Sequence, residues 1–135
     1  MKKTFGIIVM ALLMFVLSSA FKSGDQPKPW PAPEAAAAKK NPVASNAGSI
    51  ADGKELYDTH CASCHGKKGK GDGSKAAQLE TECGDLTAAV TQKQSDGALF
   101  YKIQTGRDDM PSFKKKIPDA NDIWNVVNYV RTLKK

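Results

Sequence analysis

The distribution of apolar residues predicts three amphipathic helices between residue 49 and the C-terminus. In each of them, apolar side chains recur three or four positions apart, which places them on one face of a helix. The clearest case begins after Pro118 and Asp119, and its inward face comprises Ile123, Val126, Val127, Val130 and Leu133. Candidate strands are weak, so the pattern predicts an all-α domain.

The other two helices have recognisable ends. One runs from Asp96 to Gln104 and is followed by Gly106, a typical residue after a helix C-terminus. Its inward residues are Leu99, Phe100 and Ile103. The other is expected to start at Ser49, which would cap it in a capping box with Asp52 at the N3 position. This helix leads straight towards Cys61, and on one of its faces lie Ile50, Gly53 and Tyr57.

The first twenty residues have the pattern of an export signal. Two lysines precede an apolar run over residues 5–17, and small residues suited to a cleavage site end at Ala20. The run is shorter than the roughly 20 residues that a membrane-spanning helix needs. A cleaved signal peptide over residues 1–20 is therefore favoured over an uncleaved membrane anchor. Export would place the mature chain in the periplasm or beyond it, in an oxidising compartment.

Residues 21–48 differ in composition from the segments on either side. Five of the seven prolines lie here, together with the alanine-rich sequence EAAAAKK over residues 34–40. Alternating prolines are typical of extended, polyproline-like chain, and the alanine run can form a turn or two of helix. We interpret this segment as a solvated linker or membrane tether, in which Trp30 is a residue that could dock on another surface. The folded domain is then expected to span residues 49–135.

Composition and charge exclude several classes of protein. A chain of 135 residues has room for one domain, and 41% hydrophobic with 25% charged residues argues against a polytopic membrane protein or a fully disordered chain. The net charge of +6 permits a nucleic-acid or anionic-membrane partner without requiring one. No aromatic residues interleave the lysine clusters of the domain, so nucleic-acid binding is not expected. A domain of this size has a small hydrophobic core and is expected to need further stabilisation by a covalent cross-link or a bound cofactor.

The sequence Cys61-Ala62-Ser63-Cys64-His65 is specific enough to indicate a chemistry. Its two thiols can add to the two vinyl groups of haem as thioethers, and the adjacent histidine can present a nitrogen to the iron. A thioredoxin-like dithiol would usually follow a strand of a βαβ unit, and none is predicted. A zinc site would have to use Cys83 and His60, whose spacing matches no structural zinc pattern. One covalently bound haem c is therefore the favoured cofactor.

The second axial ligand of such a haem is expected to be Met110. The other methionines lie within the predicted signal, and Met110 lies in the sequence Gly106-Arg107-Asp108-Asp109-Met110-Pro111, where charges and a proline argue against a core residue. His60 is the alternative ligand, but it directly precedes Cys61 and cannot easily reach the opposite haem face. With His65 as the proximal ligand, His/Met coordination would raise the reduction potential relative to two histidines.

Taken together, these residues resemble the class I c-type cytochromes, in particular the small bacterial monohaem type found in cytochrome-oxidase-associated modules. The resemblance extends from about Ile50 to Lys135, and it rests on the haem motif together with GKELY, GDG, SDGALFYKIQTGRDDMPSF and IWNVVNYVRTL. It implies the cytochrome c fold, all-α with three to five helices around one covalently attached haem. It also implies a close crossing of the first and last helices, where Gly53 would admit an aromatic residue such as Tyr129.

Two features depart from the family pattern. Many relatives have a proline soon after the haem histidine, and its carbonyl holds the second nitrogen of that histidine; here no proline lies between His65 and Met110. The partner of the second His65 nitrogen is therefore unassigned. Cys83 is also unexpected, and either a buried inert thiol or an intermolecular disulfide would account for it.

The resemblance implies a one-electron carrier between respiratory partners, such as a terminal oxidase or a dehydrogenase, and not an enzyme. One lysine cluster follows the haem motif, and another follows residues 106–111, which contain Met110 and which we call the methionine loop. Both clusters would lie near the haem edge, where they either steer an acidic redox partner or are simply solvated. They comprise Lys67, Lys68 and Lys70, and Lys114, Lys115 and Lys116.

Two other functions stay open at this stage. The chain could be the haem domain of a larger membrane-bound redox complex, docked through its proline-rich segment. It could instead be a ligand-binding haem protein or enzyme, provided that Met110 is not bound to the iron. The second alternative is disfavoured because no distal histidine or arginine pair is evident: we interpret Arg107 as a haem-propionate partner and Arg131 as a surface residue.

Overall fold

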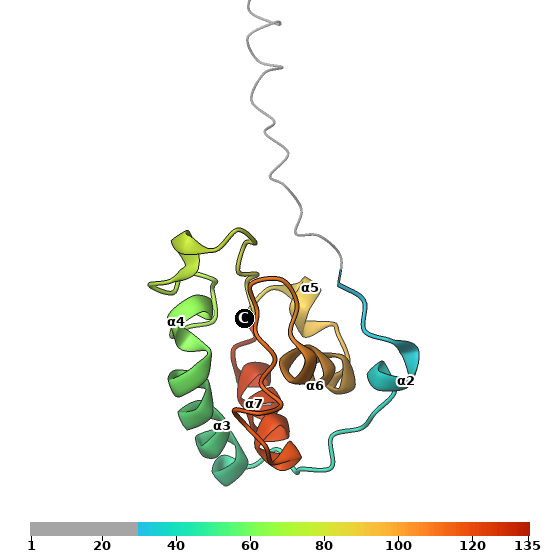
Figure 1. Cartoon of the computed structure of the whole chain (residues 1–135). Helices are drawn as coiled ribbons and strands as arrows, with labels where there is room; N and C mark the ends of the chain where they lie inside the picture. Colours follow the sequence, from blue (N-terminus) through green and yellow to red (C-terminus); the bar gives the residue numbers. More distant parts are fainter. Residues whose placement is uncertain (1–29) are drawn as a thin grey trace, which may run out of the picture.

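The computed structural model describes residues 30–135, and the expected signal peptide lies outside this range. Apart from one isolated bridge between Arg107 and Met110, the regular structure in the described residues is helical, which confirms the all-α prediction. The elements are α2 (Glu34–Ala37), α3 (Ala47–His60), α4 (Ala62–His65), the 3-10 helix η1 (Ala76–Gln78), α5 (Ala89–Gln92), α6 (Asp96–Thr105) and α7 (Ala120–Thr132) (Figure 1). None of the helices within residues 30–135 has the length and apolar character needed to cross a bilayer.

The three long helices correspond to the three predicted ones, with one difference at the start of α3. That helix begins earlier than expected, because Asn46 and not Ser49 caps it. The Asn46 side chain accepts a hydrogen bond from the Ser49 N–H at 3.0 Å, and the Ser49 hydroxyl accepts one from the Asn46 N–H at 3.1 Å. Ser49 is thus the N3 residue of the capping box, a role that the sequence analysis gave to Asp52. The caps of α6 and α7, Ser95 and Asp119, agree with the predicted starts.

Helices α3 and α7 lie side by side and cross at Gly53 (Figure 1). A Cβ atom on Gly53 would lie 1.9 Å from the carbonyl oxygen of Asn125 and 3.0 Å from the backbone nitrogen of Val126. The predicted close crossing is therefore present, but the predicted partner was wrong: Gly53 admits the backbone of α7. Tyr129 packs instead against Tyr57, with ring centroids 5.1 Å apart.

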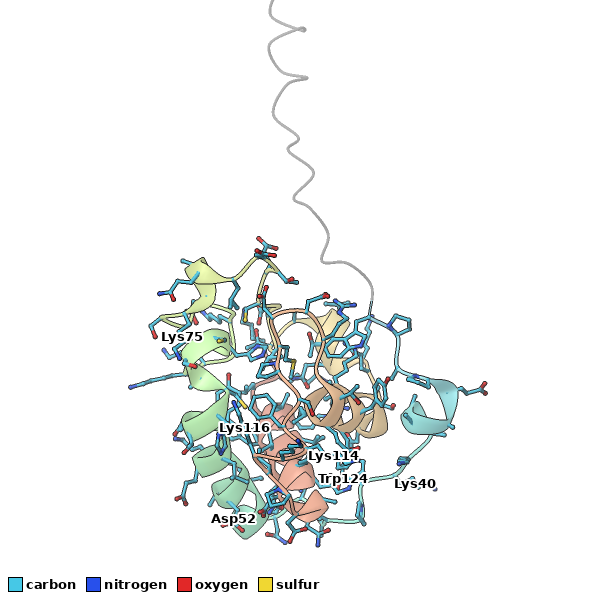
Figure 2. All side chains as sticks on the ribbon, in the orientation of Figure 1. Lys40, Asp52, Lys75, Lys114, Lys116 and Trp124 are labelled. Carbon is cyan, nitrogen blue, oxygen red and sulfur yellow. The ribbon has the colours of Figure 1, made fainter. Side chains whose placement is uncertain are left out.

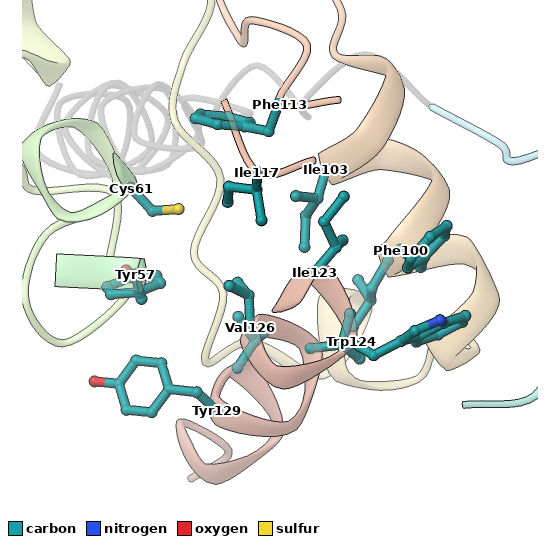
Figure 3. Packing of buried hydrophobic residues seen from close by; sticks show 13 residues of the cluster. Tyr57, Cys61, Phe100, Ile103, Phe113, Ile117, Ile123, Trp124, Val126 and Tyr129 are labelled. Carbon is teal, nitrogen blue, oxygen red and sulfur yellow. The ribbon is translucent and has the colours of Figure 1, made fainter. Parts of the chain in front are cut away.

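A hydrophobic core fills the space between α3, α6 and α7 and extends under the loop that follows Met110 (Figure 3). Phe100 and Trp124 stack in it with ring centroids 4.1 Å apart. Its buried members are Tyr57, Cys61, Leu99, Phe100, Ile103, Phe113, Ile117, Ile123, Trp124, Val126, Val127, Tyr129 and Val130. Cys61 is part of this core, so the first residue of the predicted haem motif is tied to the packing of the whole domain.

Arg131 joins α7 to the start of α6, where the sequence analysis expected a surface residue. Its Nε donates to the Asp96 carboxylate at 2.8 Å, and its two terminal nitrogens donate to the carbonyls of Gln92 and Gln94 at 2.9 and 2.6 Å. The planar guanidinium group satisfies three acceptors at once, which suits it to a position between two helices.

Residues 30–46 pack along the domain, where a solvated tether was expected; we call this segment the strap. Its short helix α2, which realises the predicted turn of alanine helix, lies against α6 (Figure 1). A Cβ on Gly97 would lie 2.3 Å from the Ala36 carbonyl oxygen, and the Ser95 hydroxyl donates to the Ala37 carbonyl at 2.6 Å. The small residues at the start of α6 therefore let the strap approach closely.

Candidate functional site

The motif Cys61–His65 forms a single turn at the end of α3. The N–H of Cys61 donates to the Tyr57 carbonyl at 2.8 Å, and the Cys61 carbonyl accepts from the His65 N–H at 2.9 Å, so α4 continues directly from α3. The Tyr57 hydroxyl, buried in the core, donates to the Gly66 carbonyl at 2.7 Å and fixes the residue after His65. Gly66 then leaves the helix with a φ of +79°, a conformation that favours glycine.

The glycine-rich loop that follows the motif folds back onto it. The Gly71 N–H donates to the His65 carbonyl at 2.9 Å, and the Gly73 N–H donates to the Cys64 carbonyl at 3.1 Å. A Cβ on Gly73 would lie 2.4 Å from the Ser63 carbonyl oxygen, so only glycine permits this approach. The loop satisfies the carbonyls at the end of α4 and thereby holds the motif in a fixed shape.

His65 lies half-buried, and its Nδ1 atom is fully buried without a hydrogen-bond partner. Burial lowers the pKa of His65, and the nearby backbone of Gly84 raises it to a smaller extent. The neutral imidazole is the form that binds a metal ion. The sequence offered no partner for this histidine, and the structure places the backbone of Gly84 beside it without a hydrogen bond to Nδ1.

The three cysteines have different surroundings. Burial, and to a lesser extent the neighbouring Cys64, raises the pKa of the Cys61 thiol to about 12. Burial is also the largest cause that raises the pKa of the Cys83 thiol, followed by the neighbouring Cys64 and Asp109. Because Cys83 is only half-buried, the inert thiol and the intermolecular disulfide both stay predictions.

Met110 lies in a tight loop that closes on itself at the end of α6. The N–H of Arg107 donates to the Met110 carbonyl at 2.8 Å, and the N–H of Met110 donates back to the Arg107 carbonyl at 2.9 Å. Gly106 makes the turn possible: its φ is +69°, and a Cβ there would lie 2.5 Å from the Met110 carbonyl oxygen. Asp108, with a φ of +52°, adopts the left-handed conformation that is uncommon outside glycine.

The methionine loop is also joined to neighbouring segments. The Asp109 carboxylate accepts a hydrogen bond from the Thr81 N–H at 2.7 Å, which links the loop to the segment containing Cys83. The Phe113 N–H donates to the Ile103 carbonyl at 3.2 Å, and the Ser112 hydroxyl donates to the Gln104 carbonyl at 2.7 Å. The contacts with Ile103 and Gln104 attach the loop to the end of α6, whereas the contact between Asp109 and Thr81 joins residues far apart in the chain, and no pattern in the sequence indicated it.

The predicted ligands lie in two groups, and one residue of each group contacts the same core. Cys61, Cys64 and His65 lie on one turn, and Met110 is a half-buried residue that packs against the cluster to which Cys61 belongs. Met110 packs against the core without being one of its buried members, as expected, and its loop is as charged as predicted. His60 faces the ring of Phe113, with centroids 6.1 Å apart.

The chemistry of these side chains fits a haem group. Two thiols on one turn match two thioether bonds, and a neutral imidazole next to the second thiol can supply a nitrogen to the iron. A half-buried thioether in a closed loop can supply a sulfur ligand with little loss of conformational freedom. Within residues 30–135, no three His, Cys, Asp or Glu side chains form a group that could hold a metal ion, so the ligand set required by the zinc alternative is not assembled there.

Comparisons with known proteins point to the same chemistry. Residues 48–130 match the protein family described as cytochrome C oxidase, cbb3-type, subunit III. Cytochrome c-554(547) of Halothiobacillus neapolitanus is 38% identical over 95 residues, which cover 65% of this chain and 100% of that protein. Cytochrome c6 of a Synechococcus species is 31% identical over 84 residues, which cover 62% of this chain and 70% of that protein.

Larger proteins contain similar domains. The cbb3-type cytochrome c oxidase subunit CcoP of Azospirillum sp. is 33% identical over 101 residues, covering 69% of this chain but only 31% of that protein. Among solved structures, a chain of the Kuenenia stuttgartiensis reducing HAO-like protein complex superposes with a TM-score of 0.62 and 26% identity. That match covers 86% of this chain and 54% of the other.

Proposed function

The chain belongs to the cytochrome c family, in the group described as cytochrome C oxidase, cbb3-type, subunit III, and from this premise we propose that it is an exported one-electron carrier with a His/Met-ligated haem. Its cofactor is covalently bound haem c. The haem supplies a reversible one-electron couple when it is bound. The protein holds that group, sets its potential and presents it to partners, and catalyses no reaction of its own on a substrate.

We assign a role to each residue of the site. Cys61 and Cys64 form the two thioether bonds, His65 is the proximal ligand and Met110 the distal one. The observation that carries this proposal is the closed loop over residues 106–111, whose paired backbone hydrogen bonds hold the Met110 thioether at the core that also contains Cys61. Such a loop suits a methionine that binds iron, because a sulfur atom that is already held in place favours occupation of the sixth coordination position of the iron.

The exposed lysines suggest how a partner is recognised. Lys67, Lys68 and Lys70 follow the motif, and Lys114, Lys115 and Lys116 follow Met110. Figure 2 shows Lys114 and Lys116 of the second cluster. The Lys116 ammonium lies 5.6 Å from the centroid of the Phe113 ring, which itself faces His60 beside the motif. We propose that these cations steer an acidic redox protein, a terminal oxidase or a dehydrogenase, towards the haem edge.

The similarity to part of an oxidase subunit and to a chain of a redox complex supports a second candidate, a haem domain docked in a larger membrane-bound assembly. Both candidates use the same one-electron chemistry at the same residues. They differ in whether the partner is bound transiently or permanently. The ligand-binding alternative differs in chemistry, because it requires a sixth position that Met110 leaves open.

Electron transfer to small inorganic reagents of opposite charge tests the carrier and the steering together. The reduced holoprotein should pass one electron to anionic hexacyanoferrate(III) and to a cationic tris(phenanthroline)cobalt(III) complex. As salt rises from roughly 10 to 200 mM, we expect the anionic reaction to slow several-fold and the cationic one to accelerate, because the field of the lysines is screened. Stopped-flow absorbance of the haem measures both rates.

Charge-reversal variants distinguish the effect of lysines near the site on these rates from the effect of lysines elsewhere. Changing Lys114, Lys115 and Lys116 together to Glu should slow the anionic reaction and accelerate the cationic one at low salt. Changing Lys39 and Lys40 to Glu on the strap should alter them far less. Rates that do not depend on salt would refute the steering, and a haem that is not oxidised by either reagent would refute the carrier itself.

A further inference from the structure

The aromatic ring of Trp30, at the beginning of the strap, lies against two cations, Arg107 of the methionine loop and Lys102 of α6. The Arg107 guanidinium carbon is 4.7 Å from the ring centroid, and the Lys102 ammonium is 5.3 Å from it. Both distances fall within the range in which a cation is attracted to the face of an aromatic ring. Trp30 is half-buried, so this attraction is screened by water less than it would be at a fully exposed site.

Arg107 is part of the methionine loop itself. It exchanges two backbone hydrogen bonds with Met110, and its Nε lies 3.2 Å from the Asp108 carboxylate. A shift of the Arg107 backbone would therefore move both the N–H and the carbonyl that hold Met110. The contact with Trp30 acts on the loop through this pair of bonds.

The Arg107 and Lys102 cations repel one another, and the Trp30 ring lies where it can offset this repulsion. Lys102 is half-buried on α6 and donates to the Gln94 side chain, and the nearby Arg107 contributes to lowering the pKa of Lys102, after the larger effect of burial. Without an aromatic ring against both groups, this repulsion would favour a movement of Arg107 away from α6. The ring of Trp30 offsets the repulsion by attracting both cations.

The strap reaches Trp30 from a region that is independently attached to the domain. Near its middle, the Ser95 hydroxyl donates to the Ala37 carbonyl at 2.6 Å. Near its end, the Asn41 side chain donates to the Asn128 side chain of α7 at 2.8 Å, and Asn128 donates to the Val43 carbonyl at 3.3 Å. These contacts lie on the strap away from the ring and hold the segment along α6 and α7 without using Trp30.

We infer that the strap is a positioning element for the methionine loop, and that Trp30 is its positioning residue, holding Arg107 and through it the distal ligand Met110. This inference rests on the proposed His/Met ligation. It gives the proline-rich segment a role in the redox site, beyond that of a linker. Loss of the Trp30 ring should weaken the bond between the methionine and the iron while leaving the fold and the covalent haem in place.

Competition by imidazole for the sixth position of the ferric holoprotein tests this inference. In Trp30→Ala, we expect the apparent affinity for imidazole to rise by about two- to thirtyfold, the range that corresponds to the loss of an ordinary cation–π contact. Trp30→Phe keeps a smaller ring face and should give an intermediate value. The far-red charge-transfer band of methionine-ligated ferric haem should weaken in the same order.

Asn41→Ala is the matched control, because it removes a strap contact at the opposite end from the loop. It should lower the melting temperature but leave the imidazole affinity at the native value. An unchanged affinity in Trp30→Ala, or an equal rise in Asn41→Ala, would overturn the positioning role while the proposed ligation stands. A native protein that lacks the charge-transfer band would instead refute the ligation, and the inference with it.

Discussion

Replacing Met110 by leucine should convert the haem from a filled to an open iron site. Leucine has nearly the volume of methionine, so the packing of residue 110 against the core should be largely kept, and the change in packing alone should cost less than about 1.5 kcal/mol in folding free energy. The sulfur donor, however, is lost. We expect a high-spin or water-ligated ferric spectrum, rapid binding of carbon monoxide to the ferrous form, and a lower midpoint potential.

The expected fall in midpoint potential is on the order of 0.1 to 0.3 V, within the span of about 0.8 V that axial ligands set in haem proteins. A redox titration followed by absorbance measures it. Ser112→Ala is the control beside the same loop, because it removes the hydrogen bond from the Ser112 hydroxyl to the Gln104 carbonyl, and a longer one from the Lys114 N–H at 3.4 Å, but leaves Met110 in place. If Met110→Leu kept the native spectrum and potential, a different residue would be the sixth ligand.

Replacing Gly53 by valine should strongly destabilise the domain without preventing haem attachment in the molecules that fold. The added side chain would meet the backbone of α7, since even a Cβ would lie 1.9 Å from the Asn125 carbonyl oxygen. Helix backbone cannot rotate aside as a side chain can, so α3 and α7 must separate. We expect a loss of at least about 3 kcal/mol in unfolding free energy, the upper part of the usual range for overpacking.

For a domain of this size, such a loss corresponds to a fall of roughly 10 to 25 °C in melting temperature. Two smaller changes within α3 provide the comparison. Gly53→Ala should also destabilise, whereas Gly48→Ala should change the stability far less, because its Cβ would meet a single side-chain atom, Oδ1 of Asn46, at 3.3 Å and alanine favours helix. Thermal unfolding followed by circular dichroism, with haem content measured in parallel, distinguishes the two positions. Equal effects at both glycines would contradict the crossing.

The features that the sequence predicted well are those encoded by neighbouring residues. The helical periodicity of Ile123 to Leu133, the proline and aspartate before α7, and the C-x-x-C-H motif all depend on short spacings. The family resemblance predicted the close approach at Gly53, but it indicated an aromatic side chain as the partner where the structure has the backbone of α7. Capping is local too, but Asn46 and Ser49 are both good capping residues, and composition alone does not decide between them.

The features that the sequence did not predict depend on contacts between distant segments. A proline- and alanine-rich segment has the composition of a solvated linker, and nothing in it indicates that Gly97 and Ser95 provide a surface on which it packs. In the same way, no local pattern pairs Asp109 with Thr81 or places the Gly84 backbone near His65. Within the strap, Trp30 was the residue that indicated packing on another surface, because a large aromatic residue is unusual in a solvated linker.

The most direct test of the proposed function is an optical spectrum of the native holoprotein, made in a host with cytochrome c maturation, before and after exposure to carbon monoxide. The His65/Met110 ligation predicts low-spin spectra in both oxidation states and a ferrous haem that does not take up carbon monoxide, because both axial positions are filled. A ferrous haem that binds carbon monoxide readily would contradict the electron-carrier assignment and indicate that the iron is open to small ligands.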